Sequence, residues 1–364
     1  MNATNTSMSS LEFYTRIAPF TLLHVLCLAA IWTGISTTSL IVCAVFFWIR
    51  MFAITAGYHR YFSHRSYKMG RVMQFLMAFL AASSTQRGVL WWAGHHRHHH
   101  KHSDQPEDLH SPVQHGFWMS HFGWFLFNPK SDPVCPKMIR EYKRFPEIIW
   151  LEKFHVFPVI TLAGIAFLID GWTGVVIGFL WSTVLLWHAT YTINSLCHVF
   201  GSRRYETTDT SRNNFWLALL TLGEGWHNNH HYYQASVRQG FFWWEIDITY
   251  YILKMMSWVG LVWDLREPPE RVRQPNPKPQ RLRGTVTVAQ PSEKEPSRPM
   301  LPTLQPQLEK AAASMSKAAD KAAESMSKAA ESMSKAAETV KDAAWNATSN
   351  AAAGSNVASK PPQP

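Results

Sequence analysis

The chain has 364 residues, of which 46% are hydrophobic, and a formal net charge of +10. This length suggests roughly two or three soluble domains. However, all 18 His and 16 of the 17 Trp precede Asp264, and the remainder is rich in Pro, Ala, Ser and Lys. The overall composition therefore averages an apolar part and a polar tail, which argues against a single soluble globule.

Charge and cysteine content point away from two other classes of protein. The sequence contains no zinc finger and no aromatic-basic RNA-binding motif, so nucleic acid is not an expected partner. A bilayer that contains anionic lipid suits the positive charge better. The four cysteines show no CxxC spacing, so neither a thiolate zinc site nor a disulfide framework is expected: Cys27, Cys43, Cys135 and Cys197.

Four apolar segments approach the length of about 20 residues that a helix needs to cross a bilayer. The first two cover residues 17–34 and 36–57, where only Arg50 interrupts the second run. The other two cover residues 156–168 and 174–193, with Asp170-Gly171 as the turn between them. The sequence therefore predicts an all-α integral membrane protein with four transmembrane helices in two hairpins and a cytoplasmic helical cap.

The distribution of Lys and Arg predicts the orientation of these hairpins. Both residues are frequent outside the hairpins and absent from the two turns. By the positive-inside rule, both termini and the long middle segment are expected in the cytoplasm. Two further apolar stretches, residues 72–92 and 241–263, contain polar or charged residues and are predicted to be buried or interfacial helices.

Composition divides the chain into three regions. Residues 1–265 are predicted to form the membrane domain, 266–305 a Pro-rich basic linker without fixed structure, and 306–364 a repeat tail. In the tail, apolar residues spaced by 11, 7 and 7 positions predict a long, weakly amphipathic helix: Met315, Met326, Met333 and Val340. Such a helix suits a spacer, a coiled coil or a membrane-surface helix, and the sequence leaves these open.

Clustered histidines carry the chemical signal. The clusters are His59-Arg-Tyr-Phe-Ser-His64, the run from His95 to His102, and His227-Asn-Asn-His230-His231, with Asn194 and His198 as a further pair. Each lies at the expected cytoplasmic end of an apolar segment. The spacing i, i+3, i+4 in the third cluster places side chains on one helical face. Because imidazole suits Fe, Zn, Cu and Ni, the pattern predicts a nitrogen-rich, polynuclear metal site at the membrane face.

Spacing alone leaves the second cluster open. It can be read as His95, His98 and His99, or as His96, His99 and His100. In the first cluster, His59 and His64 are five residues apart, which is about 140° of rotation on an α-helix. From a regular helix they could not easily serve one ion, but they could serve two neighbouring ions. The isolated histidines are interpreted as surface or core residues: His24, His115, His121, His155 and His188.

These motifs resemble the histidine boxes of membrane acyl-CoA desaturases of the stearoyl-CoA Δ9 type. The matching segments are residues 59–64, 96–101, 194–198 and 223–231, in the same order and with similar intervening lengths, and the resemblance covers residues 15–265. It selects the register that begins at His96, because the family places Arg directly after the first His. The resemblance implies a di-iron centre with these ligands: His59, His64, His96, His99, His100, His198, His227, His230 and His231, with Asn194 acting through a water.

The resemblance also implies a reaction. It predicts an O₂-dependent desaturase that introduces a cis double bond, at Δ9, into a long-chain acyl thioester, with acyl-CoA as the expected carrier. Attack on an unactivated methylene needs a metal or cofactor, here two iron ions. The sequence shows no haem, flavin, nicotinamide or iron–sulfur motif. Electrons are therefore expected from a separate carrier resembling cytochrome b5, ferredoxin or rubredoxin.

Two alternatives remain open on the sequence alone. The first is a lipid hydroxylase of the same histidine-box superfamily, which inserts oxygen instead of removing hydrogen. The second is a non-catalytic, His-rich membrane protein that binds or transports metal. Transporters place polar ligands within their spans, whereas these histidines lie at the ends of the apolar segments. Glu224 is interpreted either as a residue that orients an imidazole or as a surface residue.

Overall fold

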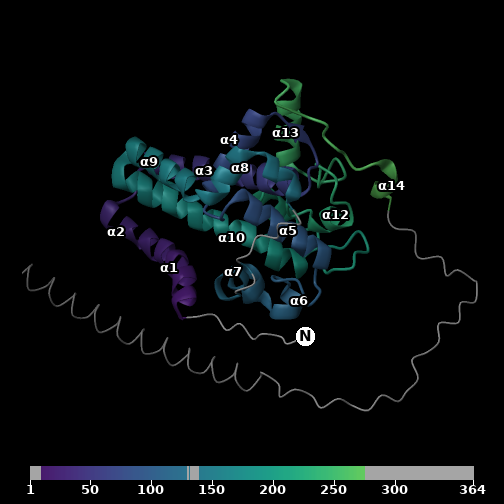
Figure 1. The fold of residues 1–364 in the computed structure, drawn as a ribbon, viewed down its shortest axis with the longest axis horizontal. Helices are drawn as coiled ribbons and strands as arrows, with labels where there is room; N and C mark the ends of the chain where they lie inside the picture. The colour runs from purple at the N-terminus through teal and green to yellow at the C-terminus, as the bar shows by residue number, and fades with distance from the viewer. Residues whose placement is uncertain (1–9, 129–130, 132–138, 275–364) are drawn as a thin grey trace, which may run out of the picture. The chain divides into compact units, whose positions relative to one another are not determined.

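The computed structural model describes residues 10–128, 131 and 139–274 (Figure 1). Within these residues the chain is mostly helical, with one two-stranded antiparallel sheet. The predicted repeat tail and most of the predicted linker lie outside them. Residues 266–274 of that linker are described and pack on the preceding domain: the Arg266 N–H donates to the Ser66 carbonyl at 3.0 Å, and Val272 joins a small aromatic cluster.

The elements of the first half are α1 (Ser10–Leu26), η1 (Cys27–Ala29), α2 (Ala30–Thr33), α3 (Thr37–Phe52), η2 (Ala53–Ser63), β1 (Lys68–Met69), α4 (Arg71–Ala82), α5 (Val89–His102), α6 (Pro112–His115), η3 (Met119–Gly123) and α7 (Trp124–Phe127). Those of the second half are η6 (Arg140–Arg144), α8 (Pro146–Lys153), α9 (Val156–Thr173), η7 (Gly174–Trp181), α10 (Ser182–Ser195), η8 (Leu196–His198), α11 (Phe215–Leu220), α12 (His227–Tyr232), α13 (Ile248–Trp258), β2 (Val262–Trp263) and α14 (Glu270–Arg273).

Within the described residues, three helices are long and apolar enough to cross a membrane: Leu11–Thr33, Thr37–Ser63 and Val156–His198. The third has 43 residues, about twice the length that spans a bilayer, and it contains both members of the second predicted hairpin. Its backbone leaves the helical region at Asp170 and Gly171. The arms on either side of this break, α9 and η7, pack together in one core cluster that includes Ala166 and Ile177.

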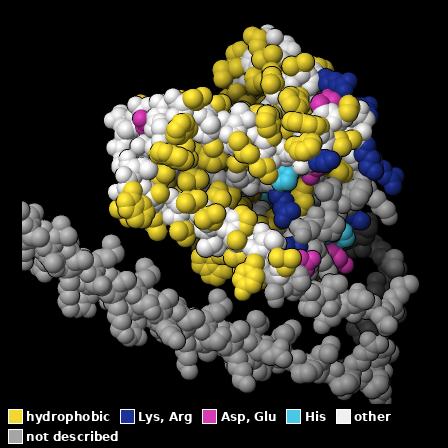
Figure 2. All heavy atoms as spheres, turned by 60° about the vertical axis from the view of Figure 1, so that its left-hand side comes forward, with side chains coloured by type: hydrophobic (Ala, Val, Ile, Leu, Met, Phe, Trp, Pro, Cys, Tyr) yellow, Lys and Arg dark blue, Asp and Glu magenta, His cyan; other side chains and the backbone are white. Residues whose placement is uncertain are grey.

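The two predicted hairpin turns meet at one end of these helices. Ser36, whose side chain caps the N-terminus of α3, donates a hydrogen bond to the Asp170 carboxylate. The Thr173 hydroxyl donates to the Thr33 carbonyl at 3.0 Å. Near this end Trp32 and Leu168 are highly exposed, and Figure 2 shows hydrophobic side chains over much of the visible face, with Lys and Arg gathered at one edge. Such an apolar surface suits lipid rather than water.

Arg50, the charge that interrupts the second apolar run, is completely buried. Its guanidinium donates to the hydroxyls of Ser182 and Thr183 at 2.6 and 2.7 Å and to the Ser83 carbonyl at 3.3 Å. A buried charge is tolerated only when its donors are satisfied. Arg50 therefore ties α3 to α10 and to the C-terminus of α4.

Neither apolar stretch that was predicted to be buried or interfacial forms one long helix. Residues 72–92 are divided between α4 and α5 by a non-helical segment. In residues 241–263, only α13 is helical, and it begins after Asp247, whose carboxylate accepts from the Tyr250 N–H at 3.0 Å. Neither stretch is among the candidate spans found in the described part of the chain.

The contact between α9 and η7 gives a test of the second hairpin. A methyl group at Gly174 would collide with the backbone carbonyl of Ala166, which cannot move without disturbing α9. We therefore expect Gly174→Ala to destabilise the protein by about 1–3 kcal/mol, the usual cost of overpacking. Thermal unfolding in detergent would measure this loss.

Gly164→Ala is the matched control, because a Cβ at this α9 glycine meets no atom within 4 Å. It should leave the melting temperature unchanged or slightly raised, since alanine favours helix. Equal melting temperatures for Gly174→Ala and the unmodified protein would contradict the observed packing.

Candidate metal centre

The nine histidines expected to bind metal come together in two groups, each of which could hold one ion. In each group one nitrogen or other donor atom per residue lies within 4.8 Å of all the others. We call the first the five-histidine cluster: His59, His64, His96, His100 and His230. The second is the four-histidine cluster: His99, His198, His227 and His231.

In the five-histidine cluster the Nε2 atoms converge. His96 Nε2 lies 2.8 Å from His64 Nε2 and 2.9 Å from His100 Nε2. His230 Nε2 lies 2.9 Å from His100 Nε2 and 3.0 Å from His59 Nε2. A neutral imidazole carries only one N–H, so these four contacts cannot all be ordinary hydrogen bonds. Nitrogen lone pairs directed at one point are the arrangement that a bound cation requires.

The structure corrects the expectation that His59 and His64 serve different ions. The segment η2 is a π-helix, in which the hydrogen bond runs from residue i+5 to residue i. The His64 N–H accordingly donates to the His59 carbonyl at 3.2 Å. Residues five apart therefore lie one above the other, with ring centroids 4.9 Å apart, and both belong to the five-histidine cluster.

Helix α5 supplies both clusters. His96 and His100 belong to the five-histidine cluster, whereas His99 belongs to the four-histidine cluster. The histidines of the alternative reading, His95, His98 and His99, do not come together. The ring of His98 lies beside that of His102, and His95 packs against Trp91 and Trp124. Helix α12 is shared in the same way, since His230 and His231 belong to different clusters.

Helix α12 is held by asparagines within and near its motif. The Asn213 side-chain carbonyl accepts from the backbone N–H groups of Asn228 and Asn229 at 3.0 and 3.1 Å. Asn228 Nδ2 donates to the Tyr205 carbonyl, and Asn229 Nδ2 donates to Glu245. All of these side chains are buried. The two asparagines between the histidines therefore fix the position of α12 rather than supplying ligands.

Carboxylates hold the histidines of the four-histidine cluster. His99 Nδ1 donates to Asp108 at 2.9 Å, His231 Nδ1 to Asp209 at 2.7 Å, and His198 Nδ1 lies 3.4 Å from Asp104. Because each of these contacts uses Nδ1, the Nε2 atom of the same ring remains available to the interior of the cluster. These three aspartates were not among the residues predicted from the sequence; their position shortly after the second cluster and before the third was the only signal.

Glu224 is buried, so the interpretation of Glu224 as a surface residue is wrong. Its position agrees with the alternative, a residue that orients an imidazole. Its carboxylate contacts His59 Nδ1 and pairs with the buried guanidinium of Arg60 at 3.0 Å. Arg60 also pairs with Asp247 at 2.9 Å. Gln239 Nε2 donates to Glu224 at 3.1 Å. This network fixes the ring of His59 and joins η2 to the N-terminus of α13.

Asn194 lies between the clusters. Its side chain lines a small cavity of about 50 Å³ that His59 and His96 of one cluster and His99 and His227 of the other also line. The backbone carbonyl of Asn194 accepts from the Ser120 hydroxyl at 2.9 Å, which fixes the end of α10. The amide is thus placed beside both clusters without being part of either group of converging histidines.

The electrostatics of the clusters suit a metal cation. Burial lowers the pKa of His231 to about 4, and it lowers the pKa of five others well below the usual range, with neighbouring imidazoles acting in the same direction: His64, His96, His100, His227 and His230. Metal ligands must be neutral imidazoles. In addition, buried His231 Nε2 has no hydrogen-bond partner among the described residues, so the donor set fits a bound ion.

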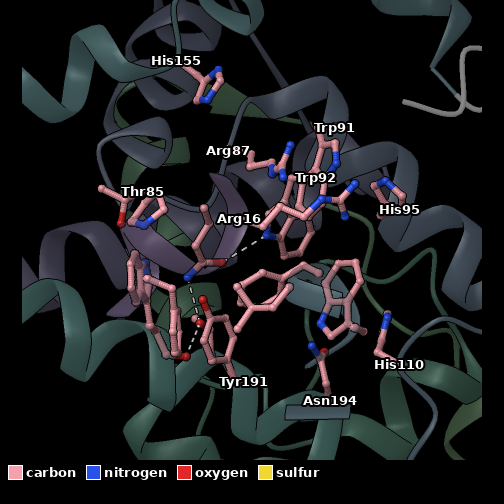
Figure 3. A pocket seen from close by; sticks show the side chains of 18 of the residues that line it. Arg16, Thr85, Arg87, Trp91, Trp92, His95, His110, His155, Tyr191 and Asn194 are labelled. Atoms are coloured by element: carbon pink, nitrogen blue, oxygen red, sulfur yellow. Dashed lines mark hydrogen bonds between the residues drawn. The ribbon is translucent and has the colours of Figure 1, made fainter. Parts of the chain in front are cut away.

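A larger cavity of about 570 Å³ adjoins the small one and shares Trp92, His96, Thr190 and Asn194 with it. Figure 3 shows His155 and Asn194 at opposite ends of this cavity, with aromatic rings between them. Gln86 lies at the junction: its amide nitrogen donates to the Thr190 hydroxyl at 2.8 Å, and its carbonyl accepts from the Trp92 indole at 3.3 Å. An aromatic channel therefore leads to the histidines past one polar junction.

Three of the isolated histidines interact with one another. His188 contacts His24 through Nε2 and His121 through Nδ1, each at 3.1 Å, and His121 Nδ1 lies 2.9 Å from the Ser195 hydroxyl. This series of histidine contacts links α1, η3 and α10 next to Asn194. None of the three belongs to either cluster, in agreement with their interpretation as structural residues.

The lowered pKa values predict how stability depends on pH when metal is removed. Six cluster histidines bind a proton near pH 6.5 in the unfolded chain but only at lower pH in the fold, so the unfolded state binds more protons. The free energy of unfolding should fall as the pH drops below about 6.5, by at most roughly 1.4 kcal/mol per pH unit for each such histidine. His99 opposes this trend, because Asp108 raises its pKa against the effect of burial.

Melting temperatures of the chelator-treated protein between pH 8 and pH 5 would test this. We expect a plateau above pH 7 and a decrease below it, and a decrease at least as large when metal is bound, because the metal keeps the histidines of the folded state unprotonated. A melting temperature that is constant over this range would show that the buried histidines do not titrate as their burial requires.

Comparisons with known proteins identify the family. The sequence profile of the fatty acid desaturase family matches residues 30–256. An acyl-CoA 5-desaturase from Anemone leveillei is 37% identical over 261 residues, which cover 68% of this chain and 78% of that protein. An sn-1 stearoyl-lipid 9-desaturase from Synechocystis sp. is 38% identical over 217 residues, covering 60% of this chain and 68% of that protein.

A third relative, delta-9 acyl-lipid desaturase 2 from Arabidopsis thaliana, is 36% identical over 231 residues, which cover 63% of this chain and 75% of that protein. The matched region includes both histidine clusters and the second and third apolar helices. Desaturases are membrane oxidoreductases, and three helices of this chain could cross a membrane. The chain therefore belongs to the fatty acid desaturase family.

Proposed function

We propose that this protein is an O₂-dependent acyl desaturase that introduces a cis double bond, at Δ9, into a long-chain acyl-CoA. The observation that carries the proposal is the convergence of nine histidines, six of them buried and three half-buried, in two clusters beside an aromatic cavity. A fatty acyl substrate agrees with the names of the relatives, which are acyl-CoA and acyl-lipid desaturases.

The two clusters would hold two iron ions, one in each. The ligands are His59, His64, His96, His100 and His230 for one ion, and His99, His198, His227 and His231 for the other, with Asn194 acting through a water. Bound there, iron supplies the oxidant that O₂ and two electrons generate, which removes hydrogen from an unactivated methylene. Sharing α5 and α12 between the clusters keeps the two sets of ligands adjacent.

The remaining residues position the substrate. The aromatic walls of the large cavity, including Trp91, Trp124 and Trp187, exclude water and suit a hydrocarbon chain. Gln86 lines the large cavity and donates to Thr190, which lines both the large cavity and the small one beside the histidines. A wall fixed at this place would help to hold one pair of carbons near the clusters, because reaction requires the reacting atoms to be closely positioned.

The large cavity also suits a phosphate-bearing carrier. Arg16 and Arg87 line it, and guanidinium groups recognise phosphate well. Both CoA and phospholipids carry phosphate. We propose acyl-CoA, because two relatives with 37 and 38% identity are named as acyl-CoA desaturases. Electrons would come from a separate carrier resembling cytochrome b5, ferredoxin or rubredoxin, with the basic cytoplasmic face as its docking surface.

Lipid analysis in a host that lacks its own desaturase tests the reaction. We expect new monounsaturated acyl chains, two irons per purified chain, and loss of at least 99% of the product for His100→Ala, since this change removes a proposed ligand. His98→Ala is the matched control on the same helix, because His98 lies outside both clusters, and it should retain most of the activity.

Three outcomes would contradict the proposal. A hydroxylated fatty acid would indicate a hydroxylase of the same superfamily. Bound zinc without iron would indicate a metal-binding role instead. Unsaturation that appears first in phospholipid, before the acyl-CoA pool, would replace CoA by a lipid as the carrier.

We also propose four membrane crossings, arranged as two hairpins, with both termini and the metal centre on the cytoplasmic side. The break at Asp170 and Gly171 supports two crossings within the 43-residue segment. The contact between Ser36 and Asp170 supports placing both turns on the same side, opposite the clusters. The absence of Lys and Arg from the turns agrees with the positive-inside rule.

Cysteine labelling tests this topology. In a variant whose native cysteines are replaced by alanine, Ile35→Cys lies in the first turn, where Ile35 is 57% exposed. It should react with an impermeant maleimide added to intact cells. Lys101→Cys, at an exposed position on α5, should react only after the membrane is permeabilised. The reverse pattern, or equal labelling of both, would refute the proposed orientation.

A further inference from the structure

Buried negative charge is distributed unequally between the two clusters. Three of the four rings in the four-histidine cluster face an aspartate through Nδ1: His99 with Asp108, His231 with Asp209 and His198 with Asp104. The carboxylate side chains are only 0, 6 and 6% exposed, respectively. Solvent therefore does little to screen their charge.

The five-histidine cluster has a different environment. Among the described residues, only His59 faces a carboxylate, that of Glu224. The charge of Glu224 is opposed by Arg60, which lies 3.0 Å away and is itself 1% exposed. Buried Nδ1 atoms of His100 and His230 have no hydrogen-bond partner in the part of the chain that the structure describes. This cluster therefore offers one more nitrogen donor but almost no compensating negative charge.

The hydrogen bonds that fix Asp104 and Asp209 show that the charge of these two aspartates is built into the fold. Asp104 accepts from the Thr210 N–H and hydroxyl at 2.7 and 2.6 Å and from the Ser111 hydroxyl at 2.5 Å. Asp209 accepts from the Ser211 N–H at 3.0 Å and from its hydroxyl at 2.5 Å. These donors stabilise the ionised carboxylates.

A carboxylate bonded to Nδ1–H makes the opposite ring nitrogen a stronger donor, and loss of such a partner typically weakens metal binding about 10–100-fold. Negative charge near a buried cation also acts with little dielectric screening. We propose that the two metal positions are unequal, and that the four-histidine cluster holds its ion more tightly because of Asp104, Asp108 and Asp209. This inference rests on the proposed function, which places one ion in each cluster.

Release of iron from the reduced holoenzyme to a coloured ferrous chelator tests the inequality. We expect two phases of one iron each. Asp108→Asn and Asp209→Asn should accelerate the slow phase about 10-fold or more and leave the fast phase unchanged. Glu224→Gln should alter only the fast phase. Glu147→Gln is the control, since the Glu147 carboxylate pairs with Arg71 at 2.6 Å and bonds no histidine, and it should change neither phase.

Mössbauer spectra of the ⁵⁷Fe-loaded variants give a second reading that does not depend on turnover. Asp209→Asn should perturb one of two quadrupole doublets and Glu224→Gln the other. Melting temperatures identify any variant that is not folded. If either Asp108→Asn or Asp209→Asn fails to fold, the other variant still tests the proposal. Release in a single phase, or an effect of Asp108→Asn and Asp209→Asn on the fast phase, would overturn the proposal.

These outcomes are distinct from failure of the proposed function. A protein that binds no iron, or that forms no unsaturated product, would refute the desaturase assignment. A protein that binds two irons, forms the product and releases both irons at one rate would refute only the inequality of the two positions.

Discussion

The structure depends on directing nine imidazoles, six of them buried and three half-buried, at two points. Moving such polar rings away from water is costly unless the ring nitrogens are satisfied. The fold meets this need partly with carboxylates on Nδ1 and partly with backbone geometry. The remaining nitrogens are left facing one another, which is unfavourable in itself and is explained most simply by cations between them.

The secondary structure around the clusters follows from this constraint. A π-helical segment places His59 above His64, and the single helix α5 divides its histidines between the two clusters. The short helix α12 is positioned by Asn213 and Glu245 through the asparagines of its own motif. Polar contacts between distant segments thus fix elements too short to be stable alone.

The cavity and the apolar helices give the metal centre its context. The large cavity is bounded by α1, α5, α10 and the segment around α7, so its walls come from segments far apart in the sequence. The apolar helices lead away from the clusters toward the two turns, which are joined by Ser36 and Asp170. The aromatic lining of the cavity suits the hydrocarbon chain of a fatty acyl substrate.

The sequence by itself determined the family, the apolar segments and the set of clustered histidines, because those signals depend on local spacing and composition. It could not choose between the registers beginning at His95 and at His96 without the family resemblance. It led to the wrong expectation for His59 and His64, because it assumed α-helical rotation where the chain forms a π-helix. Only the tertiary structure decided which histidines share a cluster and which carboxylates hold them. Asp104, Asp108 and Asp209 belong to loops whose approach to the rings depends on the packing of the whole domain, and no local pattern records it.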